Sequence, residues 1–553
     1  MSGLGIDLLE VERLERALQR RPRLGATALA AALALLAPGC GDDEEGVSGA
    51  AGAIPADAAV YMEADISGEG DQHAKLDALL AELGEIPLIG TPIEPKDLIA
   101  QTLEDLGADN GVDISYAEDF EPWLGDSLAV GYSSIDDLEP GFVLAISADD
   151  EQLARDALDR IVSADSGEET SAEYDGVSYY LNGEGEYAVG VFDELLVLTT
   201  ADEFEAAVDA ARGDSMADED AVGSAFGALP EERLAALFVD VEAAAESEAD
   251  TPEEQADLET VREVAPELLE PVAVGAVAGD RSLALDVVVG HSEDAPDFAG
   301  TAKLAEAPSD AFAALGVAAF GEQAASILER IEPFTGTLEG TDVGALADEF
   351  EQAVGVPLDE ALASFGDAVA YGRGGLPDQF VAALDMDLTG ESDAPERALD
   401  GLERLAERDA DTVLGPALGG GTGFSAEPTP EVADTSPVKF INAELLDDEL
   451  QLLVASDKAV AEQAPPADTL GETERFQAAA EALSDDYEMV GFADLEPILD
   501  SVVPGGSILD LAIGDVPPEQ AIVGFLADKF GFAAAGVRED GDHSVQRLLV
   551  GLR

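Results

Sequence analysis

A short acidic segment in the second half of the chain has the spacing that most clearly suggests chemistry. From Asp385 to Glu396, oxygen-bearing side chains occupy the first, third, fifth, ninth and twelfth positions, and a glycine occupies the sixth. EF-hand calcium loops have this spacing, because carboxylates and other oxygen atoms must surround the ion. Asp385, Asp387, Asp393 and Glu396 are therefore candidate ligands for a divalent cation such as calcium.

The same segment also fits the start of a helix. Ser392 stands at the eighth position, which is usually apolar in a calcium loop, and the pattern before the segment is that of a strand. Asp393 and Glu396 have the spacing of an N-cap pair, and Pro395 suits a first helical turn. We favour this interpretation, in which no metal is bound.

Residue groupings typical of catalysis are not found in the sequence. Nucleophilic catalysis requires a Ser or Cys near a His, and the histidines stand in polar segments expected to be loops: His73, His291 and His543. Two pairs of carboxylates could share a strand face for acid/base work, but they equally fit solvent-facing or helix-capping positions: Asp240 with Glu242, and Asp494 with Glu496. We expect no catalytic residue and no cofactor.

Composition narrows the possible partners. Of 553 residues, 120 are acidic and 26 are Lys or Arg, so the net charge is −94. Nucleic acid is excluded as a partner because phosphate requires basic side chains. The single Cys excludes a disulfide framework, and such an acidic surface suits high salt or divalent cations.

The single Cys stands at the end of a targeting signal. A basic cluster at 20–23 precedes an apolar run over 24–37, which is too short to cross a membrane, and Ala37-Pro38-Gly39-Cys40 follows. This ending resembles a bacterial lipoprotein signal. The resemblance implies cleavage between Gly39 and Cys40, acylation of Cys40, and an extracytoplasmic protein anchored to the cell membrane by lipid.

Upstream of this signal, residues 1–25 resemble the start of holo-acyl-carrier-protein synthase, a magnesium-dependent phosphopantetheinyl transferase. The resemblance rests on the segment from Gly5 to Leu14, in which Asp7 matches the family's metal-binding Asp. The family's later Glu and neighbouring Lys have no counterpart downstream, and one carboxylate alone cannot hold the metal complex. We interpret the segment as a fusion remnant.

Internal repeats indicate that the remaining chain is duplicated. The segment 124–132 returns at 365–372, 193–202 returns at 448–457, and 55–58 returns at 308–311. Phe238, Asp240 and Glu242 likewise correspond to Phe492, Asp494 and Glu496. Because the matches occur in the same order, the sequence predicts two tandem homologous halves.

Each half shows strand pairs followed by helices. Apolar residues alternate with polar ones over 60–66, which predicts a half-buried strand, and further apolar strands are expected at 142–146, 195–199, 272–278 and 283–289. Strands at 380–384, 532–537 and 545–550 are expected in the second half. This order predicts an α+β fold, in which each half is a mostly antiparallel sheet with helices on one face.

The expected domain boundaries follow from these patterns. Residues 1–39 form the extension and signal peptide, 40–53 an acidic and Gly-rich flexible tether, 54–292 the first half and 305–553 the second half. Cys40, the segment 55–61 and the strand–helix units are similar to an uncharacterised family of secreted bacterial lipoproteins, known as domain of unknown function 3352. That family implies no activity.

The leading hypothesis is a lipid-anchored, non-catalytic binding or scaffolding protein. A protein or small molecule held between the two halves is the expected ligand. The alternatives are phosphopantetheinyl transfer by the N-terminal fragment and calcium-dependent adhesion.

Overall fold

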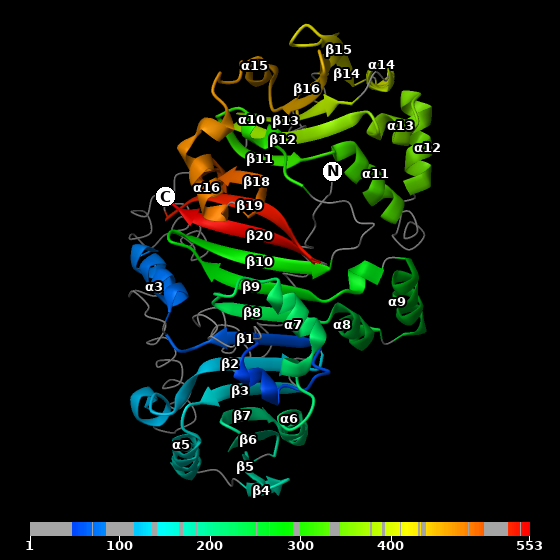
Figure 1. Cartoon of the computed structure of the whole chain (residues 1–553). Coiled ribbons are helices and arrows are strands. Elements are labelled where there is room, and N and C mark those ends of the chain that lie inside the picture. The colour runs from blue at the N-terminus through cyan, green and yellow to red at the C-terminus, as the bar shows by residue number, and fades with distance from the viewer. Residues whose placement is uncertain are drawn as a thin grey trace. The chain divides into compact units, whose positions relative to one another are not determined.

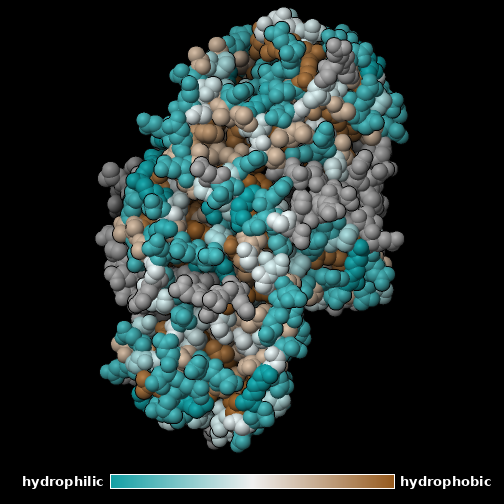
Figure 2. All heavy atoms as spheres, viewed as in Figure 1, coloured by the Kyte–Doolittle hydropathy of each residue, from teal (hydrophilic) through white to brown (hydrophobic). Residues whose placement is uncertain are grey.

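The computed structural model describes residues 47–553 except 84–114, 135–140, 165–169, 291–298, 332–342, 377–378, 390–392, 430–431, 433–437, 503–528 and the single positions 69, 184, 250, 265, 410, 485 and 542. The described residues fall into two compact units. Unit 1 lies within 1–80, 93–258 and 269–278, and unit 2 within 81–92, 259–268 and 279–553. Figure 2 shows hydrophilic residues over much of the visible surface, as the acidic composition requires.

Unit 1 contains an antiparallel sheet. Its strands are β1 (Val60–Asp65), β2 (Leu124–Tyr132), β3 (Phe142–Ala148), β4 (Thr170–Tyr174), β5 (Val177–Leu181), β6 (Tyr187–Phe192), β7 (Leu195–Thr200), β8 (Ala235–Val239) and β9 (Val272–Ala278). Hydrogen-bonded neighbours follow the order β4–β5–β6–β7–β3–β2–β1–β8–β9 (Figure 1). All these pairs are antiparallel, which is consistent with the predicted α+β class.

Helices lie on both faces of this sheet, which corrects the expectation of helices on one face. The helical segments within unit 1 are η1 (Gly49–Ala53), η2 (Tyr116–Phe120), α5 (Glu151–Ala164), α6 (Phe204–Ala210), η3 (Met216–Asp218), α7 (Asp220–Gly227) and α8 (Val241–Glu248). Three further segments are divided between the units: α3 (Asp71–Leu83), α9 (Pro252–Val264) and η4 (Pro266–Leu269). On β6, Val191 packs with Ala154 and Leu158 of α5. The adjacent Gly190 lies under Phe204 of α6. Since neighbouring strand residues point to opposite faces, α5 and α6 cover opposite sides.

Strand β1 is more buried than expected, because helices cover both faces of the sheet. The polar positions between its apolar residues were expected to face solvent, yet Tyr61 and Glu63 are 0% exposed and Asp65 is 5% exposed. Tyr61 stacks on Phe226 of α7, with ring centroids 5.8 Å apart. The strand is therefore buried on both faces, and its acidic residues require internal partners.

The segment before β1 corrects the predicted tether. Residues 40–53 were expected to be flexible, but within the described part of this segment Ala50, Ala51 and Ala53 are fully buried in η1. Ile54 covers β2 so closely that a Cβ at Gly131 would lie 2.3 Å from its Cγ2 atom. These small side chains make the segment part of the core, because they allow the backbone to approach the sheet.

Unit 2 also contains an antiparallel sheet. Its strands are β10 (Ser282–Gly290), β11 (Ala311–Val317), β12 (Phe365–Gly375), β13 (Gln379–Leu388), β14 (Thr412–Pro416), β15 (Thr422–Pro428), β16 (Phe440–Leu446), β17 (Glu449–Ala455), β18 (Glu488–Asp494), β19 (Phe530–Asp540) and β20 (His543–Leu552). Their order is β14–β15–β16–β17–β13–β12–β11–β18–β19–β20–β10 (Figure 1).

Helices cover both faces of this second sheet as well. They are α10 (Lys303–Glu306), α11 (Phe320–Ile331), α12 (Val343–Val354), α13 (Leu358–Leu362), α14 (Ala394–Arg408), α15 (Lys458–Ala461), η6 (Leu470–Glu472), α16 (Glu474–Leu483) and α17 (Leu495–Val502). On β17, Leu450 packs with Leu399 of α14, whereas Leu453 packs with Ala461 of α15. These two leucines are three positions apart and so point to opposite faces.

The boundary between the units differs from the expected one at 293–304. The last segment of unit 1 ends at Ala278, and unit 2 continues without interruption from Gly279. Strand β10 belongs to unit 2 because it pairs with β20 at nine successive positions, from Ser282 opposite Gly551 to Gly290 opposite His543. A continuous ladder of this length outweighs the loop-like composition that suggested a later boundary.

Candidate functional site

The four candidate calcium ligands do not form a metal site among the described residues. Asp385 and Asp387 share one face of β13. Gln451 Nε2 donates to Asp385 Oδ1 at 3.0 Å, and Lys303 Nζ donates to Asp387 Oδ1 at 2.7 Å. Within the described ranges, no three or more His, Cys, Asp or Glu side chains are grouped as a metal site would require. The middle of the proposed loop, 390–392, lies outside the described residues.

Lys303 links helix α10 to the sheet through two carboxylates. Its ammonium group lies 2.7 Å from Asp387 Oδ1 and 2.6 Å from Glu449 Oε1, and its side chain is 9% exposed. Burial alone would lower the pKa of Lys303, but the hydrogen bonds that its ammonium group donates to the two carboxylates raise it overall. The pKa of nearby Asp385 is raised, chiefly by burial. This cluster fixes α10 in place.

Asp393 and Glu396 stand at the start of α14, as the helix interpretation predicts. Asp393 is the N-cap residue and a proline follows in the first turn. Its side chain makes no cap hydrogen bond. Instead, Arg397 Nε donates to Asp393 Oδ1 at 3.2 Å, one turn along the helix. The expected N-cap pair with Glu396 is therefore replaced by an i,i+4 ion pair.

The histidines do not stand where they were expected. His73 is 5% exposed on α3, with Nε2 3.9 Å from Asp65 Oδ2, and His543 begins β20. Their segments are a helix and a strand instead of loops. His291 lies outside the described residues. The pKa of Asp65 is raised to about 7, chiefly by burial.

The paired carboxylates at the ends of β8 and β18 have local roles. Asp240 accepts a hydrogen bond from the Ala243 amide and caps α8. In unit 2, Arg475 pairs with both Asp494 and Glu496. Capping therefore accounts for Asp240, and ion pairing accounts for Asp494 and Glu496.

The lipidation signal belongs to a part of the chain outside the described residues. Gly39 and Cys40 lie outside the described residues, as do Asp7 and the rest of 1–25. In the part of the chain that the structure describes, no helix combines the length and the apolar character needed to cross a membrane.

A feature that the sequence analysis missed is an apolar face on the sheet of unit 2. One row of residues that lie opposite each other on neighbouring strands runs across the sheet. It consists of Leu285 on β10, Leu548 on β20, Ala535 on β19, Gly491 on β18 and Leu315 on β11. Directly opposed residues in antiparallel neighbours point to the same face. The three leucines are 41%, 53% and 49% exposed, so this apolar row faces solvent.

Small side chains between the large ones hollow this face into a groove. One level along the strands, Val550 lies opposite Ala533, and Ala533 lies opposite Ala493. We call the resulting cavity of about 420 Å³ the apolar groove. It is lined by Leu283, Leu285, Ala314, Gly491, Phe492, Ala493, Ala533, Ala534, Ala535, Leu548, Leu549 and Val550. None of these side chains carries a charge or a hydrogen-bonding group.

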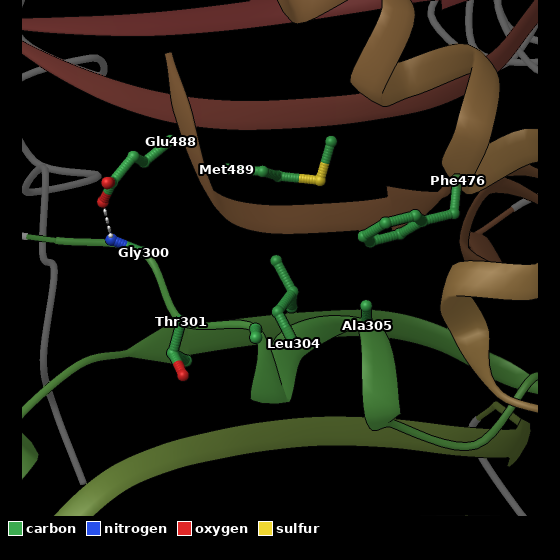
Figure 3. A pocket seen from close by; sticks show the side chains of 8 residues that line it. Gly300, Thr301, Leu304, Ala305, Phe476, Glu488 and Met489 are labelled. Atoms are coloured by element: carbon green, nitrogen blue, oxygen red, sulfur yellow. Dashed lines mark hydrogen bonds between the residues drawn. The ribbon is translucent and has the colours of Figure 1, made fainter. Parts of the chain in front are cut away.

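A β-bulge in β18 produces a second cavity on the opposite face. Met489 lies opposite Gly536, but Gly491 lies opposite Ala535, so one extra residue stands between them. The bulge turns Met489 toward the face that α16 covers, whereas Gly491 points into the apolar groove. There, Met489 lines a pocket of about 280 Å³ with Leu304, Ala305 and Phe476 (Figure 3).

One charged side chain lies at this second cavity, which we call the α10 pocket. The Gly300 amide donates to Glu488 Oε2 at 3.1 Å, at the end of the pocket away from Phe476 (Figure 3). The hydroxyl of Thr301 points away and donates to Asp367 Oδ2 at 2.5 Å (Figure 3). The pocket therefore combines apolar walls with a single carboxylate.

The composition of β19 could have indicated the groove in advance. The segment Phe532-Ala533-Ala534-Ala535-Gly536 consists mostly of small residues, which are poor strand formers. Such residues in a strand mark a place where something approaches the backbone closely.

Comparison with known proteins shows which family the sequence resembles. The sequence model of a family described as "Protein of unknown function (DUF3352)" matches residues 79–501. None of the curated proteins matches the chain.

Among solved structures, "Structure of crystal form IV of TP0453" is 9% identical, covering 75% of this chain and 96% of that chain, with a TM-score of 0.17. "Structure of crystal form I of TP0453" is 8% identical, covering 75% and 97%, with the same TM-score. Similarity at this level supports no conclusion about this chain.

Proposed function

The chain belongs to the family described as "Protein of unknown function (DUF3352)", and because that description names no activity, we propose a function from the apolar groove. In this proposal the protein is a lipid-anchored, extracytoplasmic, non-catalytic binding protein. Its unit 2 holds an apolar, chain-like ligand such as a single acyl chain.

The groove is the observation that carries the proposal. Its volume of about 420 Å³ falls in the usual range of small-molecule sites. Its floor of Ala and Gly lies between Leu548 and Leu315, which stand on strands β20 and β11. Exposed leucines on a sheet face are costly in water unless a ligand covers them. Because the lining has no polar group, a ligand's head group would remain in water.

Binding can be tested with cis-parinaric acid, a fatty acid whose fluorescence rises in apolar surroundings. The wild-type chain is expected to bind it. Ala535→Phe fills the groove from its floor and Leu548→Asp places a charge on its wall, so each is expected to weaken binding at least tenfold. Ile441→Asp is the matched control, because Ile441 is similarly exposed (43%) but stands on β16. Equal binding by Ala535→Phe, or equal loss in the control, would contradict the proposal.

Membrane attachment is proposed from the sequence at Gly39 and Cys40. An acyl chain contributes roughly 0.8 kcal/mol per buried methylene, so the several chains of a lipoprotein hold it firmly. Mass spectrometry of the mature protein is expected to find an acylated Cys40 as the first residue. A Cys40→Ser variant is expected to lose membrane association. A chain that keeps residues 1–39 with a free thiol would contradict attachment.

We also propose that the two units arose by duplication. The repeats in the sequence support this, and so does the order of strands: adding ten to each number in the unit 1 order gives the unit 2 order from β14 to β19.

Phosphopantetheinyl transfer by residues 1–25 is the enzymatic alternative. Measurable transfer from coenzyme A to an acyl carrier protein would contradict a non-catalytic role.

A further inference from the structure

The α10 pocket differs chemically from the apolar groove and lies on the other face of the same sheet. Leu304 and Ala305 come from α10, Phe476 from α16 and Met489 from the bulge in β18 (Figure 3). Phe476 is fixed by Phe492, with ring centroids 5.5 Å apart. These side chains form apolar walls around about 280 Å³, a volume that suits a ligand smaller than one for the groove.

The polar end of the pocket is negative. Glu488 is the single charged residue among the eight that line the cavity. Its Oε2 atom accepts the Gly300 amide hydrogen, which orients the carboxylate. No other bond to this carboxylate is found among the described residues, so Oε1 is available to a ligand. A neutral backbone donor orients the carboxylate without neutralising its charge.

Helix α10 is held in place independently of any ligand. Lys303, adjacent to Leu304, is bonded to Asp387 and Glu449 on the sheet. The wall formed by Leu304 and Ala305 is therefore preorganised, which lowers the entropic cost of binding.

We propose that the α10 pocket binds a small organic ammonium compound. Its apolar part lies between Leu304, Phe476 and Met489, and its protonated nitrogen pairs with Glu488. An anionic ligand would meet Glu488 without any basic partner in the lining, and a neutral one would gain nothing from the charge of this exposed carboxylate.

Calorimetric titration with three six-carbon probes tests the proposal: hexylammonium chloride, hexanol and sodium hexanoate. The wild-type chain is expected to bind hexylammonium at least fivefold more tightly than hexanol, and hexanoate more weakly than both. Glu488→Gln is expected to weaken hexylammonium binding roughly fivefold, as for a partly exposed ion pair, and to leave hexanol binding unchanged. No detectable hexylammonium binding, or equal binding of all three probes, would overturn the proposal.

Two further variants separate the pocket from the general negative charge of the protein. Glu481→Gln, on the exposed side of α16, removes the same charge without touching the pocket and is expected to bind as the wild type does. Ala302→Leu reduces the cavity volume while keeping Glu488, and is expected to weaken both hexylammonium and hexanol. If Glu481→Gln weakens binding as much as Glu488→Gln, the attraction is nonspecific and the proposal fails.

Discussion

Asp286 on β10 and Arg547 on β20 lie directly opposite each other, and the guanidinium binds both carboxylate oxygens at 2.7 Å. Asp286 is 0% exposed. Tyr487 donates to the same carboxylate at 3.2 Å, and its ring lies 4.3 Å from the centre of the guanidinium. A buried ion pair of this kind tolerates the loss of one partner poorly, because the other charge stays buried without compensation.

We therefore expect Asp286→Asn to reduce the free energy of unfolding by about 3–5 kcal/mol, measured by urea titration with circular dichroism. The double variant Asp286→Leu/Arg547→Met should regain most of that loss, because neither charge remains. Glu427→Gln is the control. It breaks a pair with Lys458 in which both side chains are more than 40% exposed, and it should lower the free energy of unfolding far less than Asp286→Asn does. Equal losses in the two single variants would contradict the structural role of Asp286.

The buried segment before β1 predicts how unit 1 responds to shortening. A chain that begins at residue 55 lacks Ile54, the alanines of η1 and the Ser48 amide that donates to Glu63 at 2.8 Å. It should lose about 2–4 kcal/mol of stability relative to one that begins at residue 47. Fluorescence of Trp123, the single tryptophan and 2% exposed in unit 1, reports this transition. If the chains that begin at residues 55 and 47 are equally stable, the prediction of a flexible tether is correct after all.

Asp65 predicts a pH dependence of unit 1. Its pKa of about 7 in the folded chain exceeds the ordinary value, so the folded state binds the proton more tightly than the unfolded state does. Stability from this group is complete below about pH 4 and is lost as the pH rises to about 7. The groups that face it are His73, Asp126, Glu63 and the Ser67 amide.

In an Asp65→Asn variant this loss should disappear. Relative to the wild type, it should gain roughly 2–3 kcal/mol between pH 4.5 and pH 8 once solvent screening is allowed for, measured by urea titration with Trp123 fluorescence. Taking the difference between the two proteins removes the general repulsion of a strongly acidic chain. A constant difference across this range would show that Asp65 titrates normally.

Calcium should have no specific effect on unit 2. Asp387 is bonded to Lys303, so a calcium ion would have to break an ion pair before using this ligand. We expect equal concentrations of CaCl₂ and MgCl₂ to raise the melting temperature equally, by screening the acidic surface. A larger rise with calcium, absent in an Asp393→Ala variant, would establish the calcium alternative.

Much of the sheet could be predicted from the sequence, because its strands have strong local patterns. Strands expected at 142–146, 195–199 and 283–289 are found at Phe142–Ala148, Leu195–Thr200 and Ser282–Gly290. Apolar β-branched and aromatic residues mark such strands without knowledge of their neighbours.

Burial of polar residues could not be predicted in the same way. Glu63 alternates with apolar residues and looks like a solvent-facing position, but Arg233 Nη2 bonds its Oε1 atom at 2.9 Å from 170 positions away. Local periodicity cannot show that such a distant partner exists. The cavities were missed for a similar reason, since each depends on strands that meet only in the folded sheet.

Because of its additional residue, strand β18 contributes side chains to both cavities. Through Gly491 it forms part of one cavity's floor, and through Met489 it forms part of the other cavity's wall. Occupants of the two cavities would therefore both contact this strand, although the sheet itself keeps them from touching each other.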